Sequence, residues 1–128
     1  MEVRKRGNQV GFIHVAVSVT APAGSADRYD ALFLVDTGAI DSMVPSSELH
    51  RVGIEPVGRK TYELADGSRA EYAFGLARIE FMGEITAGRV IFGPEGIEPF
   101  LGVTALEAGG VTIDPTTQTL RKLPAVRL

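Results

Sequence analysis

The chain has no cysteine and no tryptophan among its 128 residues, and only two histidines. Without cysteine there is no disulfide framework and no thiolate chemistry, which suits a reducing compartment, so we expect the protein in the cytoplasm. Two histidines far apart in the chain do not predict a zinc site. No glycine-rich phosphate-binding motif is present. We therefore predict neither a metal nor a cofactor.

A strong charge of one sign and long apolar runs are also missing. The net charge is only -3, so we expect no nucleic-acid partner, and no apolar segment is long enough to span a membrane. Basic residues 1–7, a following apolar stretch and Ala21-Pro22-Ala23 together resemble a secretory signal peptide. Gln9, His14 and Ser18 interrupt the stretch, however, and its valines alternate as in a half-buried strand. We therefore interpret the stretch as the first strand of the fold and not as a signal peptide.

What is present predicts one mostly β domain spanning residues 1–128, which is enough chain to bury a core. Asp66-Gly67 is a strong hairpin signal. A short helix is expected at 45–53, with Ser46 as N-cap and Gly53 as its stop, and a second at 103–108. Frequent turns are typical of a closed or sandwich-like β fold. The expected strands are 10–20, 31–35, 62–65, 69–74, 76–81, 85–92, 111–114 and 119–123.

Serine hydrolase chemistry requires a base beside the serine, and only His14 and His50 could supply one. The chain has no Gly-x-Ser-x-Gly elbow. We therefore interpret His14 as a packed histidine within a strand and His50 as a surface histidine on the first helix.

Asp36 stands out among the acidic residues because the four residues before it, Leu-Phe-Leu-Val, are all large and apolar. We expect a buried strand that delivers this carboxylate, with Gly38 allowing a sharp turn directly after it. Asp36 could instead bond its own backbone in a turn, as aspartate often does. Phosphatases of the haloacid dehalogenase type need a second aspartate two positions on, where this chain has Gly38, so that class is set aside.

The sequence resembles the retropepsin-like aspartic proteases, the single-domain, dimeric relatives of retroviral protease. Leu34-Val35-Asp36-Thr37-Gly38-Ala39 is similar to the family's catalytic loop, and Leu64 with Ala65, Asp66, Gly67 and Ser68 falls at its flap. Phe100, Leu101 and Gly102 resemble the second signature, followed by a closing hairpin at 111–114 and 119–120. The resemblance implies an all-β, closed acid-protease-type barrel with one or two short helices and a flap hairpin.

The same resemblance implies an aspartic endopeptidase that cleaves peptide or protein substrates. Two carboxylates at about 3 Å cannot both ionise, so they share one proton and activate a water. Because the chain holds one Asp-Thr-Gly, the dyad requires Asp36 from each chain of a homodimer. By the same analogy Thr37 braces the paired loops and Gly38 contacts the substrate backbone. An inactive dimerisation or peptide-binding module with this fold is the alternative.

Some positions depart from the family pattern. Ile40 stands where retroviral members carry an acidic residue, and Asp41 follows it, facing either the cleft or only the solvent. Tyr62, Tyr72 and Phe74 could line substrate subsites or pack in the core, and we expect at least two of them in the core.

Overall fold

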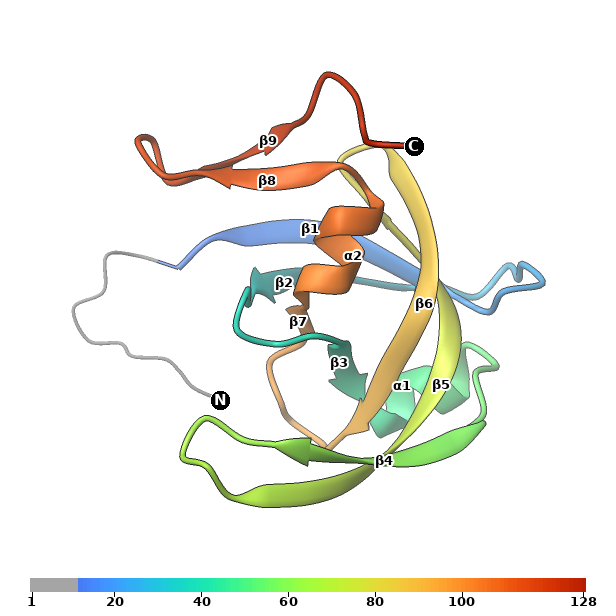
Figure 1. Ribbon diagram of the computed structural model, residues 1–128. Helices are drawn as coiled ribbons and strands as arrows, with labels where there is room; N and C mark the ends of the chain where they lie inside the picture. The colour runs from blue at the N-terminus through green and yellow to red at the C-terminus, as the bar shows by residue number, and fades with distance from the viewer. Residues whose placement is uncertain (1–11) are drawn as a thin grey trace.

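The computed structural model describes residues 12–128, which contain nine strands and two short helices. Strands are the main secondary structure of the described residues (Figure 1). The elements are β1 His14–Thr20, β2 Tyr29–Val35, β3 Ser42–Pro45, α1 Ser46–Arg51, β4 Gly58–Glu63, β5 Arg69–Phe81, β6 Glu84–Gly93, β7 Phe100–Leu101, α2 Val103–Ala108, β8 Val111–Asp114 and β9 Thr119–Lys122.

Seven strands form one sheet in the order β1-β2-β7-β3-β6-β5-β4, and β1 pairs with β5 as well. The pairings β2–β7 and β3–β6 are parallel, whereas the hairpins β1–β2, β4–β5 and β5–β6 are antiparallel. The strands β8 and β9 make a separate two-stranded sheet. In Figure 1 the β4–β5 hairpin projects at the bottom of the molecule and β8–β9 lies at the top.

Most of the predicted strands are confirmed, but several differ in their bounds. The strand predicted at 62–65 is β4 at Gly58–Glu63, and the short strands β3 and β7 were not predicted. The first strand is present at His14–Thr20, so residues 12 and 13 of the predicted range precede it, and residues 10 and 11 lie outside the described part. The segments predicted at 69–74 and 76–81 are one continuous strand, β5. It runs through Gly75, where a Cβ would lie 2.8 Å from Ile54 Cγ2 and 2.9 Å from the Glu55 carbonyl oxygen. Glycine there admits a close-packed neighbouring chain and does not end the strand.

The first helix matches its prediction at one end only. Its N-cap is Pro45, and the Ser46 hydroxyl donates to the Gly93 carbonyl instead of capping the helix, so the predicted N-cap was wrong. The C-terminal end is as predicted. Gly53 has a φ of +88°, its N–H donates to the His50 carbonyl, and the Ile54 N–H donates to the Leu49 carbonyl. These two bonds make a Schellman ending.

The apolar side chains form two clusters. The larger contains the fully buried Phe33 and Leu101, and the smaller consists of Met43, Ile91 and Phe100. The expectation that the whole Leu-Phe-Leu-Val run is buried was wrong, because Leu32 is 63 % exposed. Successive side chains of a strand face opposite ways, so the position next to Phe33 in β2 points outward. Residues 12–128 contain no helix long and apolar enough to cross a membrane.

Candidate active site

Asp36 lies directly after β2, on a loop fixed by backbone hydrogen bonds. Its N–H donates to the Leu101 carbonyl at 3.0 Å, and its own carbonyl accepts from the Ala39 N–H at 3.1 Å. The Gly38 N–H donates to Asp36 Oδ1 at 3.0 Å, which is the local turn bond that the sequence left open. The side chain is nevertheless half-buried and lines a cleft, so the turn bond holds the carboxylate at the cleft without removing it.

The second predicted signature lies directly beneath this loop. The Val103 N–H donates to the Ala39 carbonyl at 2.8 Å, and the Gly102 N–H donates to Ser42 Oγ at 3.0 Å. A Cβ on Gly102 would lie 2.6 Å from the Ile40 carbonyl oxygen. Gly102 is therefore required by the close approach of two backbones, and the N-terminus of α2 supports the Asp36 loop from below.

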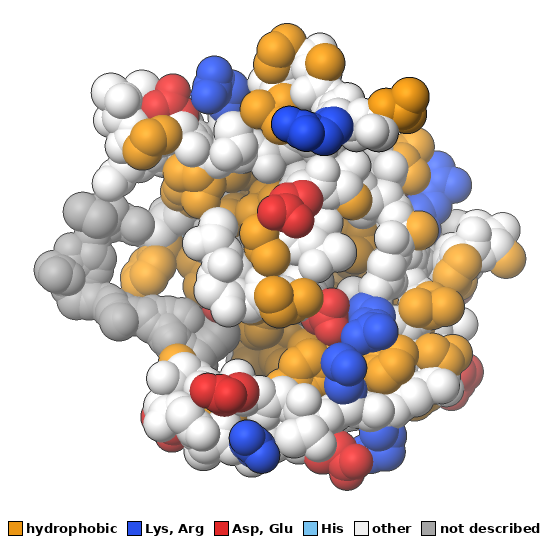
Figure 2. All heavy atoms as spheres, in the orientation of Figure 1, with side chains coloured by type: hydrophobic (Ala, Val, Ile, Leu, Met, Phe, Trp, Pro, Cys, Tyr) orange, Lys and Arg blue, Asp and Glu red, His pale blue; other side chains and the backbone are white. Residues whose placement is uncertain are grey.

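A cleft of about 840 Å³ separates this loop from the β4–β5 hairpin. The three residues of the smaller apolar cluster, Met43, Ile91 and Phe100, all line it. Figure 2 shows the hollow, with apolar side chains in its depth and acidic and basic side chains gathered at one edge. The other lining residues are Asp36, Gly38, Ala39, Ile40, Asp41, Lys60, Thr61, Tyr62, Glu63, Leu64, Ala65, Tyr72, Arg89 and Ile97.

The tip of the β4–β5 hairpin coincides with the predicted flap. The Leu64 N–H donates to the Ser68 carbonyl at 2.8 Å, and the Gly67 N–H donates back to the Leu64 carbonyl at 2.9 Å. Asp66 Oδ1 accepts from the Ser68 hydroxyl at 2.6 Å and from its N–H at 2.9 Å, and these bonds lower the pKa of Asp66. Of the five residues predicted at the flap, Leu64 and Ala65 line the cleft, and the other three form an exposed, internally bonded turn.

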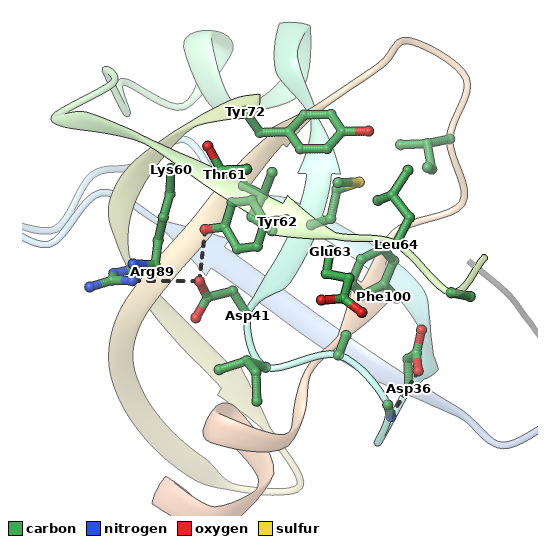
Figure 3. Close-up of a pocket in the computed structure, with 17 residues that line it drawn as sticks. Asp36, Asp41, Lys60, Thr61, Tyr62, Glu63, Leu64, Tyr72, Arg89 and Phe100 are labelled. Atoms are coloured by element: carbon green, nitrogen blue, oxygen red, sulfur yellow. Dashed lines mark hydrogen bonds and ion pairs between the residues drawn. The ribbon is translucent and has the colours of Figure 1, made fainter. Parts of the chain in front are cut away.

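Asp41 faces the cleft and is only 9 % exposed. The Tyr62 hydroxyl donates to Asp41 Oδ2 at 2.8 Å, and Arg89 Nη1 lies 3.9 Å from the same oxygen (Figure 3). Burial is the main cause that raises the pKa of Tyr62 to about 12, and the bond to this carboxylate is the second. The Arg89 guanidinium also lies 4.8 Å from the centre of the Phe74 ring. These contacts connect the hairpin strand β4 to the floor of the cleft through one buried carboxylate.

Two predictions about individual side chains were wrong. His14 is not packed inside the fold: it lies at the surface, where its Nε2 is 2.8 Å from Glu98 Oε2. His50 is on the surface as predicted. None of Tyr62, Tyr72 and Phe74 is fully buried, and both tyrosines line the cleft. Tyr62 and Tyr72 pack against the smaller cluster. These two tyrosines, which we expected in the core, therefore form part of the inner surface of the cleft.

Sequence reasoning missed three charged residues of the cleft, which are Lys60, Glu63 and Arg89. One signal was available for Lys60. It is two positions from Tyr62 in β4, and alternate residues of a strand share a face, so assigning Tyr62 to the cleft places Lys60 there too. Among residues 12–128 no group of three or more His, Cys, Asp or Glu side chains is placed to hold a metal ion.

Comparison with known proteins shows what kind of fold carries this site. No protein-family model and no curated protein matches the sequence. A solved structure that it resembles is the retroviral protease-like domain of Ddi1 from Leishmania major, with a TM-score of 0.52, 18 % identity, and coverage of 88 % of this chain and 90 % of that one. A second is EIAV protease complexed with the inhibitor HBY-793, with a TM-score of 0.51, 19 % identity, and coverage of 80 % and 92 %. The chain therefore has a retropepsin-like fold.

Proposed function

We propose that the protein is an aspartic endopeptidase that acts as a homodimer, with Asp36 from each copy forming the catalytic dyad. The observation that carries the proposal is the position of Asp36. The loop that bears it is bonded to a buried strand and a helix start, and its carboxylate lines one side of a largely apolar cleft. One chain supplies one such carboxylate, so the site is complete only when a second copy brings its own.

The chemistry follows from placing these two carboxylates side by side. Like charges at about 3 Å cannot both persist, so the pair holds a single proton. The ionised Asp36 takes a proton from a bound water, and the protonated one polarises the scissile carbonyl and then helps to expel the amine. Thr37 and Gly38 are exposed beside Asp36 in the single chain. They are therefore accessible for bracing the two loops and for contacting the substrate backbone.

The β4–β5 hairpin supports the binding of an extended peptide. β4 is the last strand in the sheet order, and within residues 12–128 it pairs with β5 alone, so its other edge offers backbone donors and acceptors. Residues 60–64 of this strand and its extension line the cleft. A peptide can add to such an edge by main-chain hydrogen bonds while its side chains enter the apolar floor. Movement of the hairpin tip at Ala65 would then close the cleft and exclude water.

The test compares the parent with Asp36→Asn in the digestion of a denatured protein from acidic to neutral pH. We expect the parent to cleave best at acidic pH and the substitution to lower turnover by about a thousandfold or more, as removal of other essential catalytic groups does. Asp27→Asn makes the same charge change in an exposed loop and serves as the matched control. If Asp36→Asn digests protein as well as the parent does, the assignment is wrong.

A non-catalytic peptide-binding or dimerisation module is the second candidate. It is favoured by the bond from the Gly38 N–H to Asp36 Oδ1, which gives the carboxylate a structural role within one chain. The cleft is also formed by a single copy. Sedimentation analysis alongside the digestion assay separates the two candidates: a stable dimer that binds peptide but turns over none at any pH supports the module.

A further inference from the structure

The charged residues of the cleft are not spread evenly along it. In Figure 3 Lys60 and Arg89 lie on the side of the cleft away from Asp36, together with Asp41. We define these two cations as the basic corner. Asp41 is the lining carboxylate that lies against it, so the corner has more positive than negative charge.

Arg89 is held in place but keeps donors for a further partner. Its guanidinium lies 4.8 Å from the centre of the Phe74 ring and 3.9 Å from Asp41 Oδ2, and these two contacts restrain the group. That oxygen already accepts the Tyr62 hydroxyl at the shorter distance of 2.8 Å. The Arg89 side chain is 42 % exposed. A guanidinium carries several N–H donors in a planar fork that matches a carboxylate, and an arginine fixed in this way loses little conformational entropy when it binds an anion.

Lys60 contributes the second positive charge from the opposite wall. It lines the cleft from β4, as Tyr62 does two residues further on. Within residues 12–128, no carboxylate lies within ion-pair distance of its ammonium group. Glu63 lines the same cleft three residues further along the strand, toward the hairpin tip. At the usual rise of about 3.4 Å per residue, that separation is about 10 Å. The strand therefore presents a positive charge far from its tip and a negative one near it.

We propose that the basic corner is a specificity subsite for an acidic side chain, aspartate or glutamate, at a substrate position removed from the bond that is cut. The inference rests on the proposed function only in taking the cleft to be a peptide site. Arg89 binds the substrate carboxylate with its planar fork, and Lys60 adds a second charge from above. Glu63 repels an acidic side chain placed closer to Asp36, so the subsite has a defined position along the peptide.

The experiment measures binding apart from cleavage. The full-length Asp36→Asn protein is applied to a randomised array of peptides blocked at both ends, and the affinities of the bound peptides are then measured with each Glu replaced by Gln. We expect enrichment of Asp or Glu at one position, and about three- to tenfold weaker binding after Glu→Gln, the range for a partly exposed charge-assisted contact. The difference should shrink as ionic strength rises, because salt screens the attraction.

Variants identify the groups responsible. Lys60→Gln with Arg89→Gln should abolish the difference between Glu and Gln peptides while leaving the apolar preferences of the array unchanged. The matched control is Arg59→Gln, which removes a positive charge from the adjacent position of β4, where Arg59 pairs with Glu71 at 3.3 Å and does not line the cleft. It should retain the full difference.

The outcomes separate this inference from the catalytic proposal. An acidic preference that survives loss of the basic corner overturns the inference, as does an array with no acidic enrichment or no bound peptide. If the preference is present and depends on the basic corner but the parent cleaves none of these peptides, the subsite stands and the catalytic proposal fails. If the parent cleaves peptides with no acidic preference, the catalytic proposal stands and the subsite is refuted.

Discussion

Substituting Gly102 by alanine tests whether the backbone at Gly102 approaches the loop that bears Asp36 as closely as it does in the structure. Gly102 has φ -86° and ψ 172°. Alanine adopts this extended conformation without strain, so the whole effect comes from the added methyl group. That carbon would lie 2.6 Å from the Ile40 carbonyl oxygen and 2.7 Å from both the carbonyl carbon and oxygen of Asp41. All three are backbone atoms.

The magnitude follows from how little these atoms can move. Adding a methyl group to a well-packed site costs about 1 to 3 kcal/mol, and the upper part of the range applies where no side chain can swing away. The Ile40 carbonyl also accepts the Thr104 N–H at 3.2 Å, and moving it weakens that bond. We therefore expect a loss of about 2 to 3 kcal/mol in the free energy of unfolding, which lowers Tm by roughly 6 to 12 °C for a chain of this size.

Urea unfolding followed by circular dichroism measures this loss, and Gly88→Ala provides the matched control. Gly88 also has an ordinary φ, but nothing lies within 4 Å of a Cβ built there. Its substitution should therefore change stability by no more than about 0.5 kcal/mol. Peptide turnover should fall in Gly102→Ala and not in Gly88→Ala, because only the first displaces the loop that bears Asp36. Equal stability of the two variants would refute the packing on which this reasoning depends.

Two further predictions concern hydrogen bonds in and around the cleft. Tyr62→Phe leaves buried Asp41 without its hydroxyl donor. We expect this to lower the free energy of unfolding by about 1 to 2 kcal/mol at neutral pH, measured by thermal or urea unfolding. Because the pKa of Tyr62 is raised from 10.0 to about 12, the bond's stabilisation is complete below pH 10 and is lost as the pH rises toward 12. In an absorbance titration, the parent should show a tyrosine step near pH 12 that is missing in Tyr62→Phe. If the two proteins titrate alike, the prediction is contradicted. Ser68→Ala should raise the pKa of Asp66 back toward its ordinary 3.8 in an NMR titration, since the hydroxyl bond favours the carboxylate. The stabilisation from that bond is present above pH 3.8 and is lost as the pH falls through the lowered pKa, and an unchanged titration would contradict the bond.

The sequence was most informative where the structure depends on local chemistry. Asp66-Gly67 marks its hairpin turn, and Gly53 ends the first helix, because each serves a conformation within a few residues of itself. Asp36 was singled out because a charged residue directly follows an apolar run. The structure places Asp36 at the cleft, with the predicted Leu101 and Gly102 beside its loop, and the catalytic role of Asp36 stays a prediction.

The sequence was least informative where a residue's surroundings depend on distant strands. Whether Leu32 is buried depends on what covers its face of β2. In the described part of a single chain, little covers that face, and Leu32 is exposed. His14 was predicted to be packed because it lies within the predicted strand 10–20, but it is the first residue of β1 and pairs with Glu98 from far along the chain. Arg89 joins Asp41 only because β6 and β3 are neighbours, a pairing that no local pattern reveals.

The double pairing of β1 has a consequence for how the chain reaches its native state. Val17 is opposite Ala31 in β2 and also opposite Phe81 in β5, so one strand joins a near neighbour and a segment many residues later. The β1–β2 hairpin can form early because its loop is short, whereas the pairing with β5 must wait until the whole intervening chain has been synthesised. Until then β1 has an open edge exposed to other molecules. Folding should therefore be slow for a protein of this length, and nascent chains that have not yet emerged as far as Phe81 should be the species most prone to self-association.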